Sequence, residues 1–266
     1  MRASADAPLD RHTDRIAPAP RVEEGGELNP RLVSLIAPAS FEAEQYRSLR
    51  HRLESRPGDE RLQVVAVTSA VPGEGKTTTA INLAGALAQS RESRVLLIDA
   101  DLRRPGVGVQ LGLPDSRGTG LADAILDPTL SLESVILRRV PLSIGILTAG
   151  RLPPAPYEAL QSPRLGALLK EARGLFDHVV VDTPPLIPVP DCRLIARWVD
   201  GLLMVVAADR TPRKMFEEGL NLIEPAKMIG LVFNGERRSR SGYYGYSRAY
   251  AGSPRPPRRE SRAGAR

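Results

Sequence analysis

The sequence has little cysteine, few aromatic residues and no long apolar run. Its single cysteine, Cys192, excludes an internal disulfide bond and a cysteine-based metal cluster, and it fits a reducing compartment. The longest uninterrupted apolar stretch, residues 202–208, is far shorter than the roughly 18 to 20 residues that span a bilayer, and the amino terminus lacks an apolar signal segment. We therefore expect a cytoplasmic chain that reaches a membrane only through a partner or, weakly, through its basic tail.

The positive charge of the chain is confined to its carboxyl-terminal tail. The whole sequence carries +6, and residues 237–266 contain nine Arg and one Glu, or +8, which leaves −2 for the remainder. The folded part therefore lacks the basic character of a nucleic-acid-binding domain, and we expect no nucleic-acid partner. The tail can still contact phosphates or an anionic membrane surface.

Both ends of the sequence lack the periodicity of a folded segment. Residues 1–40 mix Pro, Ala, Arg and Glu, and residues 237–266 are mostly Arg, Ser, Gly, Pro and Tyr. We expect both segments to be disordered and a single folded domain to occupy residues 41–236.

Alternating apolar runs and helical patterns predict an α/β fold. Strands are expected at residues 62–67, 95–98, 143–147, 179–181, 202–207 and 229–233, and helices at 41–55, 77–88, 156–172, 191–198 and 212–223. Such runs indicate a doubly wound, mostly parallel sheet with helices on both faces, whose ligands bind beyond the carboxyl ends of the strands. Ser40 is expected to cap the first helix, whose apolar stripe is Tyr46, Leu49 and Leu53.

A phosphate-binding P-loop follows the first predicted strand. The motif matches Walker A except that Ala70 replaces its first Gly. The loop N–H groups and the next helix N-terminus point at phosphates, Lys76 reaches the β and γ oxygens, and Thr77 ligates Mg²⁺. The predicted cofactors are therefore ATP and Mg²⁺. The residues assigned to nucleotide binding are Gly73, Glu74, Gly75, Lys76, Thr77 and Thr78.

Aspartates end two later strands of the predicted sheet. Asp99 and Asp101 end one strand, and Asp182 ends another in the manner of a Walker B carboxylate. We expect the three to meet at the P-loop, where one helps hold Mg²⁺ and another accepts the proton of an attacking hydroxyl. Arg103 is expected to neutralise developing phosphate charge, although a strand end with a local salt bridge is the structural alternative. Asp191 is expected to cap the helix that it begins.

These three motifs resemble the Walker A, Walker A′ and Walker B motifs of the bacterial tyrosine kinases. The resemblance implies a P-loop protein-tyrosine autokinase that regulates capsule or exopolysaccharide polymerisation and export. By that resemblance Asp101, Asp182 and Thr77 serve Mg²⁺, and Asp99 is the base toward a tyrosine hydroxyl. Asn234, at the end of the last strand, resembles the adenine-side asparagine of related ATPases.

Two further patterns support the kinase interpretation, and the resemblance extends over about residues 41–250. Four of the six tyrosines lie within eight residues of the tail and resemble the family's terminal phosphoacceptor cluster. These tyrosines are Tyr243, Tyr244, Tyr246 and Tyr250. An ExxRxxR pattern on the first helix resembles the family element associated with ring-like self-assembly. Its residues are Glu44, Arg47 and Arg50, and a solvated face with an intrahelical Glu44–Arg47 pair is the alternative.

The resemblance implies attack in trans between protomers and a separate transmembrane polysaccharide co-polymerase as activator. Two other functions remain open. A partition or septum-positioning ATPase shares the fold, but it carries a signature lysine where this chain has Val71 and it lacks a tyrosine tail. In a non-catalytic assembly module ATP only stabilises an oligomer, and the intact pair Asp99 and Asp101 argues against it.

Overall fold

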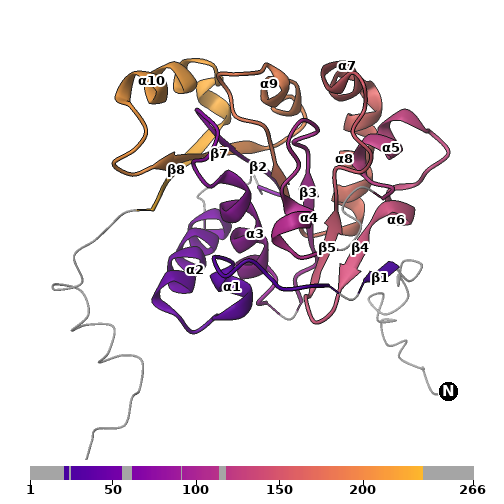
Figure 1. Ribbon diagram of the computed structural model, residues 1–266, viewed down its shortest axis with the longest axis horizontal. Coiled ribbons are helices and arrows are strands. Elements are labelled where there is room, and N and C mark those ends of the chain that lie inside the picture. Colours follow the sequence, from indigo (N-terminus) through magenta and orange to yellow (C-terminus); the bar gives the residue numbers. More distant parts are fainter. Residues whose placement is uncertain (1–20, 24, 56–61, 91, 114–117, 236–266) are drawn as a thin grey trace, which may run out of the picture. The chain divides into compact units, whose positions relative to one another are not determined.

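The computed structural model describes residues 21–23, 25–55, 62–90, 92–113 and 118–235, which belong to one compact unit (Figure 1). The predicted tail and its four tyrosines lie outside the described residues. The strands are β1 Arg21–Glu23, β2 Val64–Ser69, β3 Val95–Asp99, β4 Leu137–Arg139, β5 Ile144–Leu147, β6 His178–Asp182, β7 Gly201–Ala207 and β8 Met228–Asn234.

The helices alternate with these strands along most of the chain, as the sequence predicts. They are α1 Val33–Ile36, α2 Phe41–Glu54, α3 Lys76–Leu87, α4 Val107–Gln110, α5 Leu121–Leu126, α6 Leu132–Val135, α7 Pro156–Gln161, α8 Pro163–Leu175, α9 Asp191–Ile195 and α10 Arg213–Asn221, with a 3₁₀ turn at Pro225–Lys227. Among the described residues, no helix is both long enough and apolar enough to cross a bilayer.

The described strands form one eight-stranded sheet in the order β1-β4-β5-β3-β6-β2-β7-β8. Every neighbouring pair is parallel except β4 and β5. The P-loop strand β2 lies between β6 and β7, and β3 lies on the other side of β6. The predicted mostly parallel, doubly wound sheet is therefore confirmed, and its order brings the ends of β2, β3 and β6 together.

Apolar side chains alternate between the two faces of the sheet. Val64 and Ala66 of β2 belong to one buried cluster with residues of α5 to α9, whereas Val65 and Val67 belong to a second cluster with residues of α3 and α4. Figure 1 shows these two helical layers on either side of the sheet. Burial on both faces explains why the strands read as continuous apolar runs.

The predicted elements are present with small differences in their ends. Ser40 caps α2, since its hydroxyl accepts a hydrogen bond from the Ala43 N–H at 3.1 Å. The helix predicted at residues 156–172 is instead two helices, α7 and α8, because Ser162 precedes Pro163 and has an extended ψ of 135°. Strands β1 and β4 and the short helices α1, α4, α5 and α6 were not predicted.

The prediction that residues 1–40 are entirely disordered is wrong for residues 21–23 and 25–40. This part of the chain contains β1 and α1, and Leu32 is fully buried. Its apolar residues Leu28 and Leu35 pack against the cluster that contains α3. Composition alone did not reveal that this segment is ordered, because its few apolar residues are buried only through contact with a distant helix, α3.

Candidate functional site

The P-loop adopts the tight geometry that its glycines predict. Gly73 and Gly75 have φ values of 81° and 92°, in the left-handed region that disfavours other residues. A Cβ on Gly75 would lie 2.0 Å from Nδ2 of Asn234, whose amide donates a hydrogen bond to the Glu74 carbonyl at 2.9 Å. The asparagine that ends β8 therefore fixes the P-loop backbone.

The Glu74 side chain points into the protein. Its carboxylate accepts hydrogen bonds from the Val71 N–H at 2.9 Å, the Ala207 N–H at 3.3 Å and the Thr211 hydroxyl. Glu74 is 2% exposed. Its carboxylate thus ties the P-loop to the end of β7, a contact that the sequence motif does not reveal.

Lys76 joins the P-loop to the strand-end carboxylates. Its Nζ lies 2.9 Å from Oδ2 of Asp101 and 3.8 Å from Oδ1 of Asp182. Burial lowers the pKa of Lys76, but the charges of Asp182 and Asp101 outweigh burial and the pKa is raised overall. The lysine is therefore charged and held at the point where the predicted motifs meet.

Asp182 is a buried carboxylate whose hydrogen-bonding capacity is not used. Burial raises its pKa to about 6, against the opposing effects of Lys76 and the nearby Thr77 hydroxyl. Neither Asp182 oxygen has a hydrogen-bond partner among the described residues, because the nearby Thr77 hydroxyl does not have the geometry of a hydrogen bond to it. An unsatisfied carboxylate beside a hydroxyl fits a hard cation with oxygen ligands, such as Mg²⁺.

Asp99 is fully buried, and both of its oxygens accept hydrogen bonds. Oδ2 accepts from the N–H groups of Gly106 and Val107 at 2.9 Å each, and Oδ1 accepts from the Asp101 N–H at 3.2 Å. Burial, together with the neighbouring charge of Asp182, raises the pKa of Asp99 to about 8. Asp99 therefore holds the loop after β3 in this conformation.

The three aspartates converge on the lysine and do not themselves form a metal cage. No group of three or more His, Cys, Asp or Glu side chains suited to a metal is found within the described ranges. Mg²⁺ in such sites usually keeps several waters and phosphate oxygens as ligands. The geometry consequently fits an ion that is completed by the nucleotide.

Arg103 and Asp191 form an ion pair across the site. The guanidinium lies 2.7 Å and 3.1 Å from the two oxygens of Asp191, which is fully buried. The prediction that Asp191 caps α9 is wrong, because Pro190 is the N-cap and its helix has no side-chain cap. Arg103 matches the salt-bridge alternative, so its predicted role toward phosphate charge requires this pair to open.

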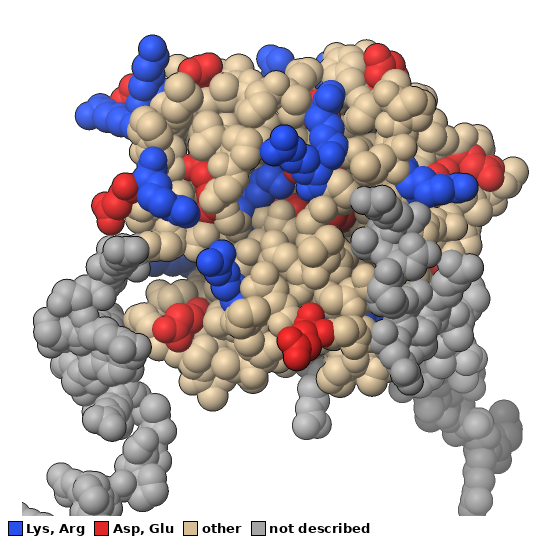
Figure 2. Space-filling view, viewed as in Figure 1, with Lys and Arg blue, Asp and Glu red and all other residues tan. Residues whose placement is uncertain are grey.

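Figure 2 shows basic side chains near the middle of the face on which β2 and β3 end, with carboxylates visible between them. Arg103 and Arg104 lie in the loop after β3 and both are exposed. Arg103 is paired with Asp191, so Arg104 adds positive charge to this rim, which favours the approach of an anionic ligand such as a nucleotide.

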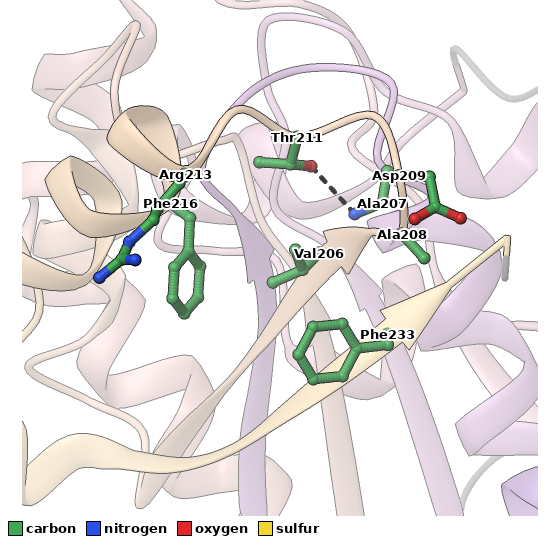
Figure 3. A pocket seen from close by; sticks show the side chains of 8 residues that line it. All are labelled: Val206, Ala207, Ala208, Asp209, Thr211, Arg213, Phe216 and Phe233. Carbon is green, nitrogen blue, oxygen red and sulfur yellow. Dashed lines mark hydrogen bonds between the residues drawn. The ribbon is translucent and has the colours of Figure 1, made fainter.

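A pocket of about 300 Å³ lies at the carboxyl ends of β7 and β8, next to the Ala207 and Thr211 groups that Glu74 of the P-loop contacts (Figure 3). Phe233 of β8 and Phe216 of α10 both line it. The Ala207 N–H donates a hydrogen bond to the Thr211 hydroxyl at 3.1 Å on its inner side. The aromatic lining and the volume suit a small planar group.

The ExxRxxR residues of α2 all have partners within the chain. Arg47 pairs with Glu44 and also donates a hydrogen bond to the Pro38 carbonyl at 2.8 Å. Arg50 lies 2.9 Å from Glu54 and donates to the Ala86 carbonyl of α3 at 3.2 Å. The intrahelical pair that was the alternative interpretation is present.

Comparisons with known proteins identify the family. Residues 65–242 match the family described as the CobQ/CobB/MinD/ParA nucleotide binding domain. The tyrosine-protein kinase YwqD of Bacillus subtilis is 34% identical over 85% of this chain and 94% of its own length. The succinoglycan biosynthesis transport protein ExoP of Rhizobium meliloti is 36% identical over 78% of this chain, which spans only 27% of that relative.

A solved structure gives the same result. The kinase domain of the Escherichia coli tyrosine kinase ETK aligns with a TM-score of 0.72 and 31% identity, over 83% of this chain and 87% of that domain. Both the fold and the sequence are shared along most of the chain. The chain therefore belongs to the bacterial tyrosine kinases, within the CobQ/CobB/MinD/ParA family of nucleotide-binding domains.

Proposed function

We propose that this chain is an ATP-dependent protein-tyrosine autokinase that regulates the polymerisation and export of capsule or exopolysaccharide. The observation that carries the proposal is the contact of Lys76 with Asp101 and Asp182, at the end of a P-loop of the required conformation. Phosphoryl transfer needs a fixed lysine, loop N–H groups and carboxylates around the phosphates. Membership of the bacterial tyrosine kinases supports the same chemistry.

Mg²⁺ is proposed to bind near Thr77 and Asp182, with Asp101 close by. The two buried, unpartnered oxygens of Asp182 support this assignment. When bound, the ion supplies positive charge that neutralises the β and γ phosphate oxygens. With a nucleotide bound, Lys76 would contact the phosphates in place of Asp101, and that carboxylate would then be available to the ion.

Asp99 is proposed to accept the proton of the attacking tyrosine hydroxyl. A pKa of about 8 is close to the working pH, as proton acceptance requires. Because Asp99 is fully buried and bound by the N–H groups of Gly106 and Val107, the loop after β3 must shift before a hydroxyl reaches it. The catalytic conformation therefore differs from the described one in this loop.

The nucleobase is proposed to occupy the pocket beside Phe216 and Phe233. The proposal is supported by the pocket's position next to Ala207 and Thr211, whose groups contact Glu74 of the P-loop. Stacking on an exposed aromatic ring is a usual way to bind a planar base. Asn234 then acts on the nucleotide through the P-loop backbone to which it is bonded.

The phosphoacceptors are proposed to be the tail tyrosines of a neighbouring protomer, in a ring-like homo-oligomer formed through α2. Their residues are Tyr243, Tyr244, Tyr246 and Tyr250. A transmembrane polysaccharide co-polymerase is the proposed activator, so the kinase works at the inner face of the plasma membrane. The similarity to a protein named for succinoglycan transport supports this setting.

The decisive experiment is incubation of the purified chain with Mg-ATP, followed by phosphotyrosine detection and mass spectrometry of the tail. A cytoplasmic segment of the activator is added in parallel, so that a silent isolated chain is recognised. Lys76→Met and a variant with all four tail tyrosines changed to Phe are the controls. Phosphate on the tail that both variants lose supports the autokinase.

Other outcomes would redirect the assignment. ATP hydrolysis without phosphotyrosine, even with the activator segment, favours a positioning-type ATPase of the MinD/ParA kind. Nucleotide binding without any turnover favours a non-catalytic assembly module. Either result removes the tyrosine cluster from the mechanism.

A further inference from the structure

The segment at residues 25–37, which we call the strap, crosses the chain next to α4. Figure 1 shows it running from the β1 side past α4 to α1. The Gly26 N–H donates a hydrogen bond to the Gly112 carbonyl at 2.7 Å, and the Asn29 N–H donates to the Gln110 carbonyl at 2.9 Å. A Cβ on Gly112, whose φ is 61°, would lie 2.5 Å from the Glu27 carbonyl oxygen. Strap and α4 are therefore in backbone contact.

A buried asparagine of α3 binds the other half of the strap. Oδ1 of Asn82 accepts a hydrogen bond from the Ser34 N–H at 2.9 Å, and its Nδ2 donates to the Arg31 carbonyl at 3.0 Å. The same Nδ2 donates to the Thr78 carbonyl at 2.9 Å, one helical turn earlier. Asn82 is fully buried, so these bonds are made away from water.

Apolar packing holds the middle of the strap. Leu32 is fully buried in the same cluster as Val107 and Leu111, which begin and follow α4. Leu35 approaches α3 so closely that a Cβ on Gly85 would lie 2.7 Å from it. The strap thus fills the space between α3 and α4.

Helix α4 in turn contacts the nucleotide site on its other side. The Thr78 hydroxyl of the P-loop donates a hydrogen bond to Oε1 of Gln110 at 2.9 Å. A Cβ on Gly106 would lie 3.2 Å from the Thr77 side chain, and the Gly106 N–H is one of the donors to Asp99. Gln110 therefore touches the strap with its carbonyl and the P-loop with its side chain.

We propose that the strap positions α4 against the P-loop, and that Gln110 is the positioning residue that transmits this contact to the first turn of α3. Helix α4 has only four residues, and a helix of that length is not stable alone. Its position is therefore set by the strap on one side and α3 on the other. The nucleotide site thus depends on a segment that lies 39 to 51 residues before Lys76 in the sequence.

A double-mutant cycle in the full chain tests this coupling. The variants are Leu32→Ala, Gln110→Ala and the double variant, and the measurement is the Kd for Mg-ATP at a temperature where each variant is folded. Each single change is expected to raise the Kd for Mg-ATP about fivefold, which matches the free energy of about one hydrogen bond. In the double variant the Kd is expected to rise by no more than about fivefold to tenfold, because both changes break the same connection.

Control variants separate positioning from general loss of stability. Ile36→Ala lies on the strap and Val109→Ala on α4, and both residues are exposed, at 45% and 72%. Neither should change the Kd by more than about twofold. Amide exchange at residues 106–113 should rise in Leu32→Ala, whereas exchange in α8 should not change.

Two results would overturn the proposal. Unchanged Mg-ATP affinity in Leu32→Ala, or a double variant weakened by the full product of about 25-fold, means that the strap and Gln110 act independently. If Leu32→Ala does not fold, Leu32→Val replaces it in the same cycle with a smaller expected effect. Because the readout is binding, a failure here is distinct from a failure to phosphorylate tyrosine.

Discussion

Two groups of aspartates, one fully buried and one only partly buried, have opposite pKa shifts in this molecule. At the nucleotide site, burial raises the pKa of Asp99 to about 8 and that of Asp182 to about 6, and Lys76 offsets this only in part. Burial also raises the pKa of Asp123 and Asp200 elsewhere in the fold. There, arginine and backbone N–H donors outweigh burial, and the pKa of each is lowered overall.

The contacts of the two groups explain the difference. Asp200 lies 2.6 Å from Arg173 and accepts hydrogen bonds from the Gln63 and Val64 N–H groups at 2.8 Å each. Neither buried oxygen of Asp182 has a hydrogen-bond partner among the described residues, and Lys76 Nζ lies 3.8 Å from Oδ1. The structural aspartates are thus satisfied within the fold, whereas the site retains unsatisfied charge that a nucleotide and its metal ion can use.

Removing Lys76 from the aspartates of the nucleotide site should produce the largest effect on activity. Lys76→Met removes the cation that contacts both Asp101 and Asp182, and the phosphates lose its fixed charge. We expect the rate of phosphoryl transfer to fall at least about 100-fold. The measurement is the initial rate of phosphotyrosine formation, with Lys170→Met, an exposed lysine of α8, as the control. A loss of less than about tenfold would contradict the role of Lys76.

Asp99→Asn should show how the raised pKa of Asp99 changes the free energy of unfolding with pH. The folded pKa of about 8 lies above the ordinary value of 3.8, so the native state keeps a proton that the unfolded state releases between these values. The wild type therefore loses stability as pH rises through this window. The free energy of unfolding of Asp99→Asn, relative to that of the wild type, should therefore rise by up to about 1.4 kcal/mol per pH unit.

Urea unfolding at pH 5, 6, 7 and 8 measures this trend. Asp200→Asn is the matched control, because a lowered pKa has its effect below the ordinary value of 3.8 and not in this range. Its stability difference from the wild type should be flat from pH 5 to 8. If the stability difference from the wild type had the same pH slope in both variants, the two groups of aspartates would not differ in their pKa shifts.

Asp200→Asn should itself destabilise the fold by about 2 kcal/mol at neutral pH, since it weakens charge-assisted bonds. Because the folded pKa is lowered, the contribution is present above the ordinary pKa and is lost as pH falls through the folded value. Arg173→Met should cost a similar amount. The double variant should cost less than the sum of the two, as measured by urea unfolding at pH 7.

The central strands and the site motifs could be predicted because their signals are local. Each of β2, β3 and β6 is a short buried run, and a parallel sheet places the residues that follow such strands at one edge. The contact of Lys76 with Asp101 and Asp182 follows from this rule. The signals needed are the P-loop motif and the aspartates at or just after the ends of β3 and β6.

The missed features depend on contacts between distant segments. Leu32 is buried only because α3 and α4 lie beside it, and Arg103 finds Asp191 88 residues later. Gln110 has no motif that distinguishes it from a surface glutamine. Strand β4 has three residues and pairs antiparallel to β5, so it lacks the long apolar run of a central strand.

The smallest expected effect concerns an ion pair outside both groups. Arg213 and Glu217 lie 2.7 Å apart on α10, but their side chains are 89% and 53% exposed. Water screens the pair, so we expect a coupling below about 0.5 kcal/mol in a double-mutant cycle with alanine, and less at high salt. Urea unfolding of both single variants and the double variant measures it. A coupling as large as that of Arg173 with Asp200 would mean that burial does not decide which carboxylates matter.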